Sequence, residues 1–219
     1  MPTTYAHYKF GKEVLSALPR PLQNSIEAHR ELFDIGLHGP DILFYYNALK
    51  KDPVNEQGHT LHEQFADEFF HHAVEVIEKA KDPAAARAYI YGFICHFALD
   101  SECHPYVEKI MQVGRVSHNE IEMELDRMML TEDYHDPLRY LTAKHIQPKM
   151  EYAEVIAPFF KDVTAEQIYK ALKGMVFYHK LFLAPTSGKR KALFLGMKAV
   201  GKYDSLHDIV MSVKPDPLC

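Results

Sequence analysis

Tryptophan is absent from the 219-residue chain, and cysteine occurs only three times, as Cys95, Cys103 and Cys219. A membrane-spanning helix needs about 20 apolar residues. The longest nearly apolar run, 88–99, is much shorter and is interrupted by His96. The N-terminus shows neither a charged leader nor an apolar stretch, so we expect no secretory signal. An odd cysteine count without such a signal favours a reducing cytoplasm.

Alternating strand patterns between turn signals are also missing, and apolar residues recur with helical periodicity along nearly the whole chain. Hydrophobic residues make up 47% of the sequence, enough to exclude wholesale disorder. We therefore expect an all-α fold, a compact multi-helix single domain, in which Pro105 ends one long helix. The expected helices span residues 21–34, 42–49, 60–80, 84–104, 117–130, 136–160, 164–183 and 189–200.

Acidic residues are missing from one segment, 167–203, which carries eight Lys and Arg residues. Residues 1–166 carry 27 acidic and 16 basic residues, so the net charge of −5 conceals an asymmetry. We predict a helical metal-binding catalytic body over 1–166 and a basic helical segment over 167–219, packed on the same domain. The segment 167–203 could attract anionic lipid, substrate phosphate or a nucleic acid backbone, or form an ordinary solvated basic face.

Histidine is the residue type in excess, with 14 copies, nine of them between His59 and His145. Histidine is the commonest metal ligand in proteins. Two pairs have the spacing i, i+4, which places both side chains on one helix face: His96 with Asp100, and His118 with Glu122. A single pair of this kind is more often an ordinary surface pair.

A metal site is favoured because the two pairs lie close together in the sequence with His104 between them. The loop after Pro105 could bring His104 to His118 and Glu122, and three such ligands make a tetrahedral zinc site with one open position. Charged groups on an apolar helix also need compensation, which a metal ion supplies.

The chain resembles the zinc-dependent phospholipase C family, the bacterial phosphatidylcholine-hydrolysing type, whose helical fold is shared with fungal zinc nucleases that act on single strands. The resemblance lies in residues 5–11, 36–46 and 61–62 and in the two helical motifs, and covers roughly 1–135. It implies a zinc-dependent hydrolase that cleaves a phospholipid or related phosphodiester. Two close metal ions suit that chemistry, because they clamp the attacking and leaving oxygens.

The resemblance also implies two or three zinc ions and a role for particular residues. The first zinc set is His62, His96 and Asp100, the second is His104, His118 and Glu122, and the third is His7 with Asp100, which would bridge two ions. Asp41 would be the catalytic carboxylate that orients or deprotonates the attacking water.

Two positions remain open. The secreted family members complete the third site with an N-terminal tryptophan, so Met1 or, after trimming, Pro2 would have to replace it here. His59 is an alternative to His62, which we prefer because Leu61-His62 opens the expected helix 60–80. Cys95, Cys103 and the other histidines are expected to be ordinary surface or core residues.

Two other functions fit the same residues: a nuclease or other phosphoesterase of the same fold, and a metal-binding protein without turnover. The expected partner is a phospholipid or phosphodiester substrate, with possible peripheral membrane contact through 167–203. Nucleic acid is the less favoured partner, and no partner protein is implied.

Overall fold

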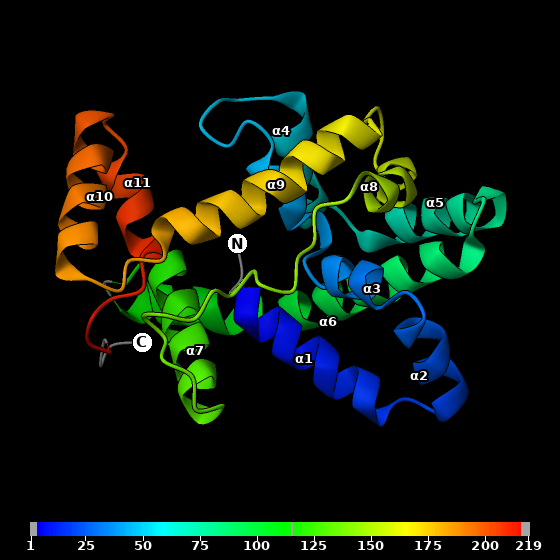
Figure 1. The fold of residues 1–219 in the computed structure, drawn as a ribbon, viewed down its shortest axis with the longest axis horizontal. Helices are drawn as coiled ribbons and strands as arrows, with labels where there is room; N and C mark the ends of the chain where they lie inside the picture. Colours follow the sequence, from blue (N-terminus) through cyan, green and yellow to red (C-terminus); the bar gives the residue numbers. More distant parts are fainter. Residues whose placement is uncertain (1–3, 115, 216–219) are drawn as a thin grey trace. The chain divides into compact units, whose positions relative to one another are not determined.

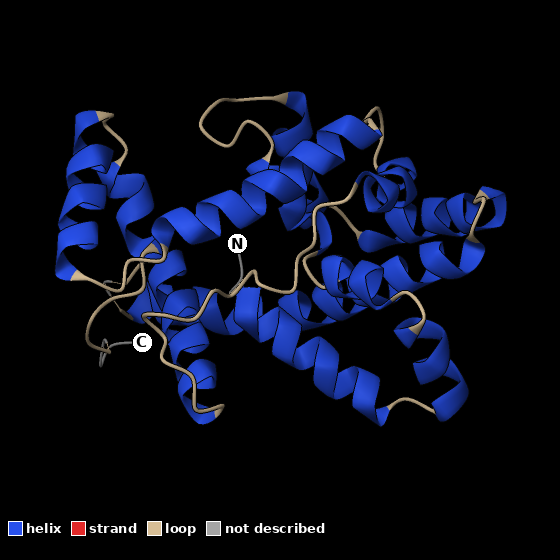
Figure 2. Ribbon diagram, in the orientation of Figure 1, coloured by secondary structure: helices blue, strands red, loops and turns tan. Residues whose placement is uncertain are grey.

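The computed structural model describes residues 4–114 and 116–215 (Figure 1). Every regular element among these residues is a helix, and they contain no strand (Figure 2). The all-α prediction is therefore confirmed. The chain forms two compact units: a larger unit of residues 7–98 and 144–177, and a smaller unit of residues 1–6, 99–143 and 178–219.

The larger unit contains most of its helices in the first half of the chain. They are α1 (Thr4–Ala17, from His7 onward), α2 (Arg20–Glu27), α3 (Arg30–Gly36), η1 (Gly39–Tyr45), α4 (Pro53–Glu63), α5 (Ala66–Lys79) and the first part of α6 (Pro83–Val113). From the second half come α8 (Met150–Ile156), η2 (Ala157–Phe159) and most of α9 (Ala165–Phe182).

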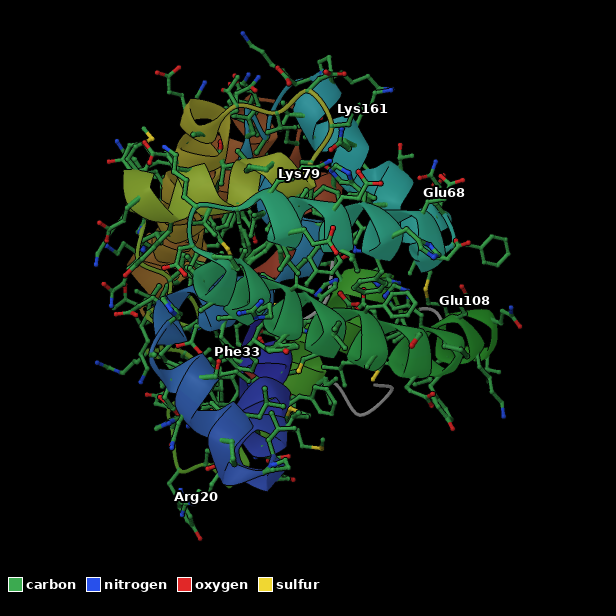
Figure 3. All side chains as sticks on the ribbon, turned by 90° about the vertical axis from the view of Figure 1, so that its right-hand side faces the viewer. Arg20, Phe33, Glu68, Lys79, Glu108 and Lys161 are labelled. Atoms are coloured by element: carbon green, nitrogen blue, oxygen red, sulfur yellow. The ribbon has the colours of Figure 1, made fainter. Side chains whose placement is uncertain are left out.

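The core of the larger unit joins α1, α2, α3 and α6 through buried side chains, namely Leu15, Ile26, Phe33, Leu37 and Cys95. Figure 3 labels Phe33, and also Arg20, which projects outward from the start of α2. A second layer forms where Phe69 of α5 stacks on Phe93 of α6, with ring centroids 4.2 Å apart. These contacts hold the His96 segment of α6 among the neighbouring helices.

The smaller unit holds the rest of α6, α7 (His118–Glu132), the end of α9, α10 (Ser187–Ala199), α11 (Tyr203–Leu206) and η3 (His207–Ile209). Val107 of α6 packs with Val116 and Ile121 at the start of α7. A separate cluster of Ala184, Met197 and Val210 buries the inner face of α10.

Side-chain caps account for several helix starts. At α7, Ser117 Oγ accepts from the Glu120 N–H while the Glu120 carboxylate accepts from the Ser117 N–H, which is the capping box that the sequence predicts. Thr164 and Gln167 exchange the same pair of bonds before α9. Asp82 accepts from two N–H groups in the first turn of α6.

Pro105 does not end α6, so that expectation is wrong: the helix continues to Val113. Proline removes one backbone hydrogen bond from a helix interior. Burial of Val107 against Val116 and Ile121 beyond that point supplies compensating packing.

Four other expected helices are also wrong in their extent. In place of the expected helix 42–49 the chain forms the 3₁₀ helix η1, which ends at Tyr45 and is followed by turns. The expected helix 60–80 is two helices, because the Asp52 capping box starts α4 at Pro53 and the chain is extended at Gln64 and Phe65. The expected helix 136–160 is helical only from Met150, since turns occupy most of 136–149. The expected helix 21–34 is broken between α2 and α3.

Within the smaller unit, the His179 ring lies between two threonine hydroxyls, with Nδ1 3.0 Å from Thr142 Oγ1 and Nε2 3.3 Å from Thr4 Oγ1. Burial disfavours the charged ring and lowers the pKa of His179 to about 4. The unfolded chain takes up this proton near the ordinary value of 6.5. The contribution of the buried, neutral His179 ring to the free energy of unfolding is therefore fully present above pH 6.5 and is lost as the pH falls toward 4.

We expect the melting temperature to fall as the pH is lowered through this window and the fall to be shallower in His179→Gln. Calorimetry across pH 7 to 4 measures both slopes. The control is His71→Gln on α5, at an exposed ring whose Nδ1 lies 2.8 Å from the Asp67 carbonyl oxygen of the same helix. Equal slopes in the parent and in His179→Gln would contradict the assignment.

Candidate metal centre

Asp41, His62 and His96 form one group in the larger unit. Each offers a ligand atom, and these atoms all lie within 4.8 Å of one another. The three residues come from three elements, η1, α4 and α6. Asp41 and His96 are buried and His62 is half-buried. Three donors of this kind at this separation suit a single zinc ion, which histidine nitrogens and carboxylate oxygens bind.

The His62 ring is held in one tautomer. Its Nδ1 lies 2.7 Å from the Gly58 carbonyl oxygen, which can only accept, so Nδ1 carries the proton. Nε2 of the neutral ring then presents a lone pair, and it lies 3.0 Å from Asp41 Oδ1. Two acceptors this close require a proton or a cation between them. A histidine whose second nitrogen is fixed by a carbonyl is typical of metal ligands.

His7 lies beside this group. Its ring stacks on that of His96, with centroids 4.4 Å apart, and both residues are buried. His7 is in the first turn of α1, where the N–H groups of Tyr5 and Ala6 donate to the Asp126 carboxylate at 3.1 and 2.8 Å. This buried carboxylate caps the start of the helix that carries His7.

Glycines allow η1 to approach α6. A Cβ at Gly36 would lie 2.1 Å from the Tyr89 carbonyl oxygen, and one at Gly92 would lie 2.2 Å from that of Phe33. The backbones of α3 and α6 therefore touch. Three residues later Gly39 has a φ of +48°, and a Cβ there would lie 2.3 Å from His96 Cδ2. Gly39 thus leaves room for the His96 ring beside Asp41.

The smaller unit contains a second group, His104, His118 and Glu122, again with ligand atoms within 4.8 Å of one another. His118 Nε2 and Glu122 Oε1 are 2.7 Å apart on successive turns of α7. The rings of His104 and His118 meet edge to face, with centroids 5.4 Å apart. The Ser117 capping box sets where α7 begins, and so fixes the face on which His118 and Glu122 lie.

Asp100 follows His96 by one turn on α6 and is buried. Its Oδ2 is 3.9 Å from His104 Nε2, one further turn along the helix. The three side chains at i, i+4 and i+8 therefore share one face of α6. The bridging role of Asp100 remains a prediction.

Among the two candidate histidines of α4, the structure brings His62, and not His59, to Asp41 and His96. The His59 ring instead lies against Phe44, with centroids 4.4 Å apart. Asp41, predicted as the catalytic carboxylate, offers an oxygen within 4.8 Å of the ligand atoms of both histidines, and its catalytic role remains a prediction. Met1 and Pro2, the predicted replacements for an N-terminal tryptophan, lie outside the described residues.

The two described cysteines are thiols. Burial raises the pKa of Cys95 to about 11. Burial, and then the nearby carboxylates of Asp100, Glu102 and Glu122, raise the pKa of Cys103. The thiolate is the form that binds metal. Their environments therefore fit the expectation of ordinary cysteines.

Sequence reasoning missed a histidine pair in the larger unit. His38 Nε2 lies 2.7 Å from His145 Nε2, and Tyr8 stacks on the His145 ring with centroids 4.0 Å apart. His38 directly precedes η1, and Tyr8 follows His7 on α1. The pair thus ties the 144–149 segment to two elements of the candidate centre. The 107-residue separation of the two histidines left no local signal of their contact.

We expect Gly39→Ala to weaken zinc binding at Asp41, His62 and His96 by at least about tenfold. The new Cβ would displace the His96 ring, and the left-handed backbone conformation adds strain of about 1–2 kcal/mol. Competition with a chromophoric chelator measures the affinity. Gly188→Ala on α10 is the matched control, because a Cβ there meets nothing within 4 Å. Parent-like zinc affinity in Gly39→Ala would show that Gly39 does not position His96.

No helix among the described residues combines the length and apolar character needed to cross a membrane. Searches of curated proteins and of solved structures found no match to the chain. A family model described as zinc dependent phospholipase C matches residues 6–174. This match extends beyond the 1–135 region in which the sequence motifs lie, and it spans both candidate metal groups. The chain therefore belongs to the zinc-dependent phospholipase C family.

Proposed function

We propose that this protein is a zinc-dependent phosphodiesterase of the phospholipase C type that hydrolyses a phospholipid. The observation that carries the proposal is the Asp41–His62 contact, in which a carboxylate and a histidine lone pair converge beside the buried His96. Family membership supports the reaction class, since the family is one of zinc-dependent hydrolases.

The proposed ligands fall into three sets. One ion would be held by His62, His96 and Asp100, a second by His104, His118 and Glu122, and a third by His7 with Asp100, which would serve two ions. The i, i+4, i+8 spacing along α6 supports this arrangement, because one rigid helix supplies His96, Asp100 and His104. When bound, zinc ions polarise phosphoryl oxygens and lower the pKa of water toward 7.

Asp41 is the proposed proton acceptor. A carboxylate has two oxygens, so Oδ1 can face His62 while the other oxygen accepts a proton from the attacking water. Burial of Asp41 keeps bulk water from competing for this position. Gly58 holds the His62 ring so that Nε2 stays directed at Asp41. The proton of the attacking water thus passes to Asp41 as the water oxygen bonds to phosphorus. The bond between phosphorus and the diacylglycerol oxygen breaks, and that oxygen leaves as an alcohol with a proton from solvent water.

The substrate is proposed to be presented at a lipid surface, with peripheral contact through residues 167–203. Cytoplasmic localisation and the division of the chain at residue 166 stay predictions. Assays on phosphatidylcholine, other phospholipids and single-stranded oligonucleotides distinguish the lipid substrate from a nuclease or another phosphoesterase of the same fold.

Elemental analysis of zinc-supplemented protein is expected to return two or three zinc ions per chain. Removing them with a chelator should lower the melting temperature, because buried ligands bind metal in the folded state only.

We expect His62→Gln to hold one zinc ion fewer and the neighbouring His59→Gln to retain the parent content. A zinc content near zero, or a melting curve unchanged by chelation, would contradict the proposal.

Asp41→Asn is expected to lower phospholipid hydrolysis by roughly 10²- to 10⁴-fold, the usual contribution of a positioned general base, with the zinc content retained. Turnover and zinc content are measured on the same preparation. Loss of one zinc ion in this variant would make Asp41 chiefly a ligand. A parent protein that hydrolyses none of the phosphoesters would favour metal binding without turnover.

A further inference from the structure

The acid-free segment 167–203 carries an unusual helix surface on α10. Residues 188, 191, 192, 195 and 199 are exposed, and the helical repeat of 100° per residue places them on one face. Leu195, with 69% of its surface exposed, lies near the middle of this face among glycine and alanine. Lys191 and Lys198 border it on one side. Solvent-facing helix surfaces are normally charged or polar.

The last turns of α9 repeat this composition. Exposed positions recur at 173, 177, 180 and 181, again on one face of the helix. Phe177 is 58% exposed and has Lys173 and Lys180 one turn to either side, with Leu181 beside it. We refer to the outward faces formed by Lys173, Phe177, Lys180 and Leu181 on α9 and by Lys191, Leu195 and Lys198 on α10 as the basic-apolar stripes.

Only some of the basic residues in this segment have a structural task. Lys189 Nζ donates to the carbonyl oxygens of Lys180 and Leu183, which closes the end of α9. Arg190 donates to the carbonyl oxygens of Ala184 and Met211. Lys180 and Lys191, by contrast, form no ion pair within the described part of the chain. Their charges therefore remain available to an outside partner.

We propose that the basic-apolar stripes of α9 and α10 bind an anionic phospholipid surface. Lysines attract the negative charge of such a surface, and their long stems let the ammonium groups reach the headgroups while neighbouring apolar side chains enter the interface. A phosphate backbone of nucleic acid would attract the lysines but would not bury the exposed apolar surface of Phe177 and Leu195. The exposed apolar residues at the centre of each stripe therefore favour lipid.

The benefit of such docking rests on the proposed function, because docking would hold the enzyme at a surface made of its phospholipid substrate. The binding itself is independent of turnover. We therefore test it in the full-length zinc-loaded Asp41→Asn protein, which is expected to leave the vesicles intact.

The experiment is co-sedimentation with vesicles of phosphatidylcholine alone and of phosphatidylcholine mixed with phosphatidylserine. We expect binding to the mixed vesicles at physiological salt and weaker binding at high salt. Lys180→Gln/Lys191→Gln should bind the mixed vesicles about twentyfold more weakly, from about fivefold per lysine near such a surface. Phe177→Ser/Leu195→Ser should also bind more weakly, with less dependence on salt.

The matched control is Val74→Ser/Lys79→Gln on α5, where Val74 is 56% exposed and Lys79, labelled in Figure 3, pairs with Glu75. It removes an exposed apolar residue and a lysine from an acidic part of the chain and should bind as the parent does. Equal loss in the control and the stripe variants, or equal binding to both vesicle types, would overturn the inference. So would stripe variants that keep vesicle binding and lose binding to a single-stranded oligonucleotide.

Turnover of the zinc-loaded enzyme with intact Asp41 separates this inference from the proposed function. The stripe variants should hydrolyse monodisperse short-chain phospholipid as the parent does, and hydrolyse vesicles more slowly. If the parent hydrolyses no phospholipid yet the binding results hold, the proposed function fails and the lipid-binding surface stands. If hydrolysis of vesicles is equal in all variants and their binding is unchanged, the surface fails and the proposed function stands.

Discussion

Backbone contact between α3 and α6 is the constraint on which the candidate centre of the larger unit depends. Gly36 and Gly92 let the two helices approach until each glycine faces a carbonyl of the other. Any side chain at either position would have to push the helices apart, and protein interiors transmit such shifts because they are tightly packed. The chain leaves α3 at this contact and reaches Gly39 and Asp41 within five residues, so the approach of the helices determines how close Asp41 comes to His96.

The same close approach is followed by a change from α-helix to the 3₁₀ helix of η1. An α-helix continued from α3 would turn residues 39–41 on a regular 100° repeat, whereas the left-handed Gly39 redirects the backbone over the His96 ring. Asp41 then meets His62 from α4, and the Gly58 carbonyl aims that ring. Each step relies on a local backbone feature, but together they gather three elements around one point.

Features that depend on residues close together in the sequence were predicted well. The Ser117–Glu120 box, the His96–Asp100–His104 face and the His118–Glu122 pair follow from helical spacing, and the all-α fold follows from periodicity. Features decided by distant packing were not predictable in this way. Pro105 was expected to end α6 because its local cost is evident, whereas the burial of Val107 against α7 is not visible in the sequence.

The candidate site shows the same division. The ligand group of the smaller unit lies on two helices with regular spacing, so its composition could be anticipated. His38 and His145 meet across 107 residues, and the Gly36–Gly92 contact depends on a helix crossing; neither has a local signature. Asp41 was identified only through the family resemblance of residues 36–46, and its contact with His62 of another helix has no signal in the sequence.

The potential ligands along α6 share one physical requirement. One helix places a histidine, a buried carboxylate and a second histidine on successive turns of one face. A buried carboxylate between rings that present lone pairs is costly unless positive charge accompanies it, since burial disfavours unpaired charge and facing acceptors repel. Protons on the rings or divalent ions can provide that charge. In the larger unit the Gly58 carbonyl takes up Nδ1, so Nε2 of His62 is the ring atom that meets this charge beside Asp41, be it a proton or a metal ion.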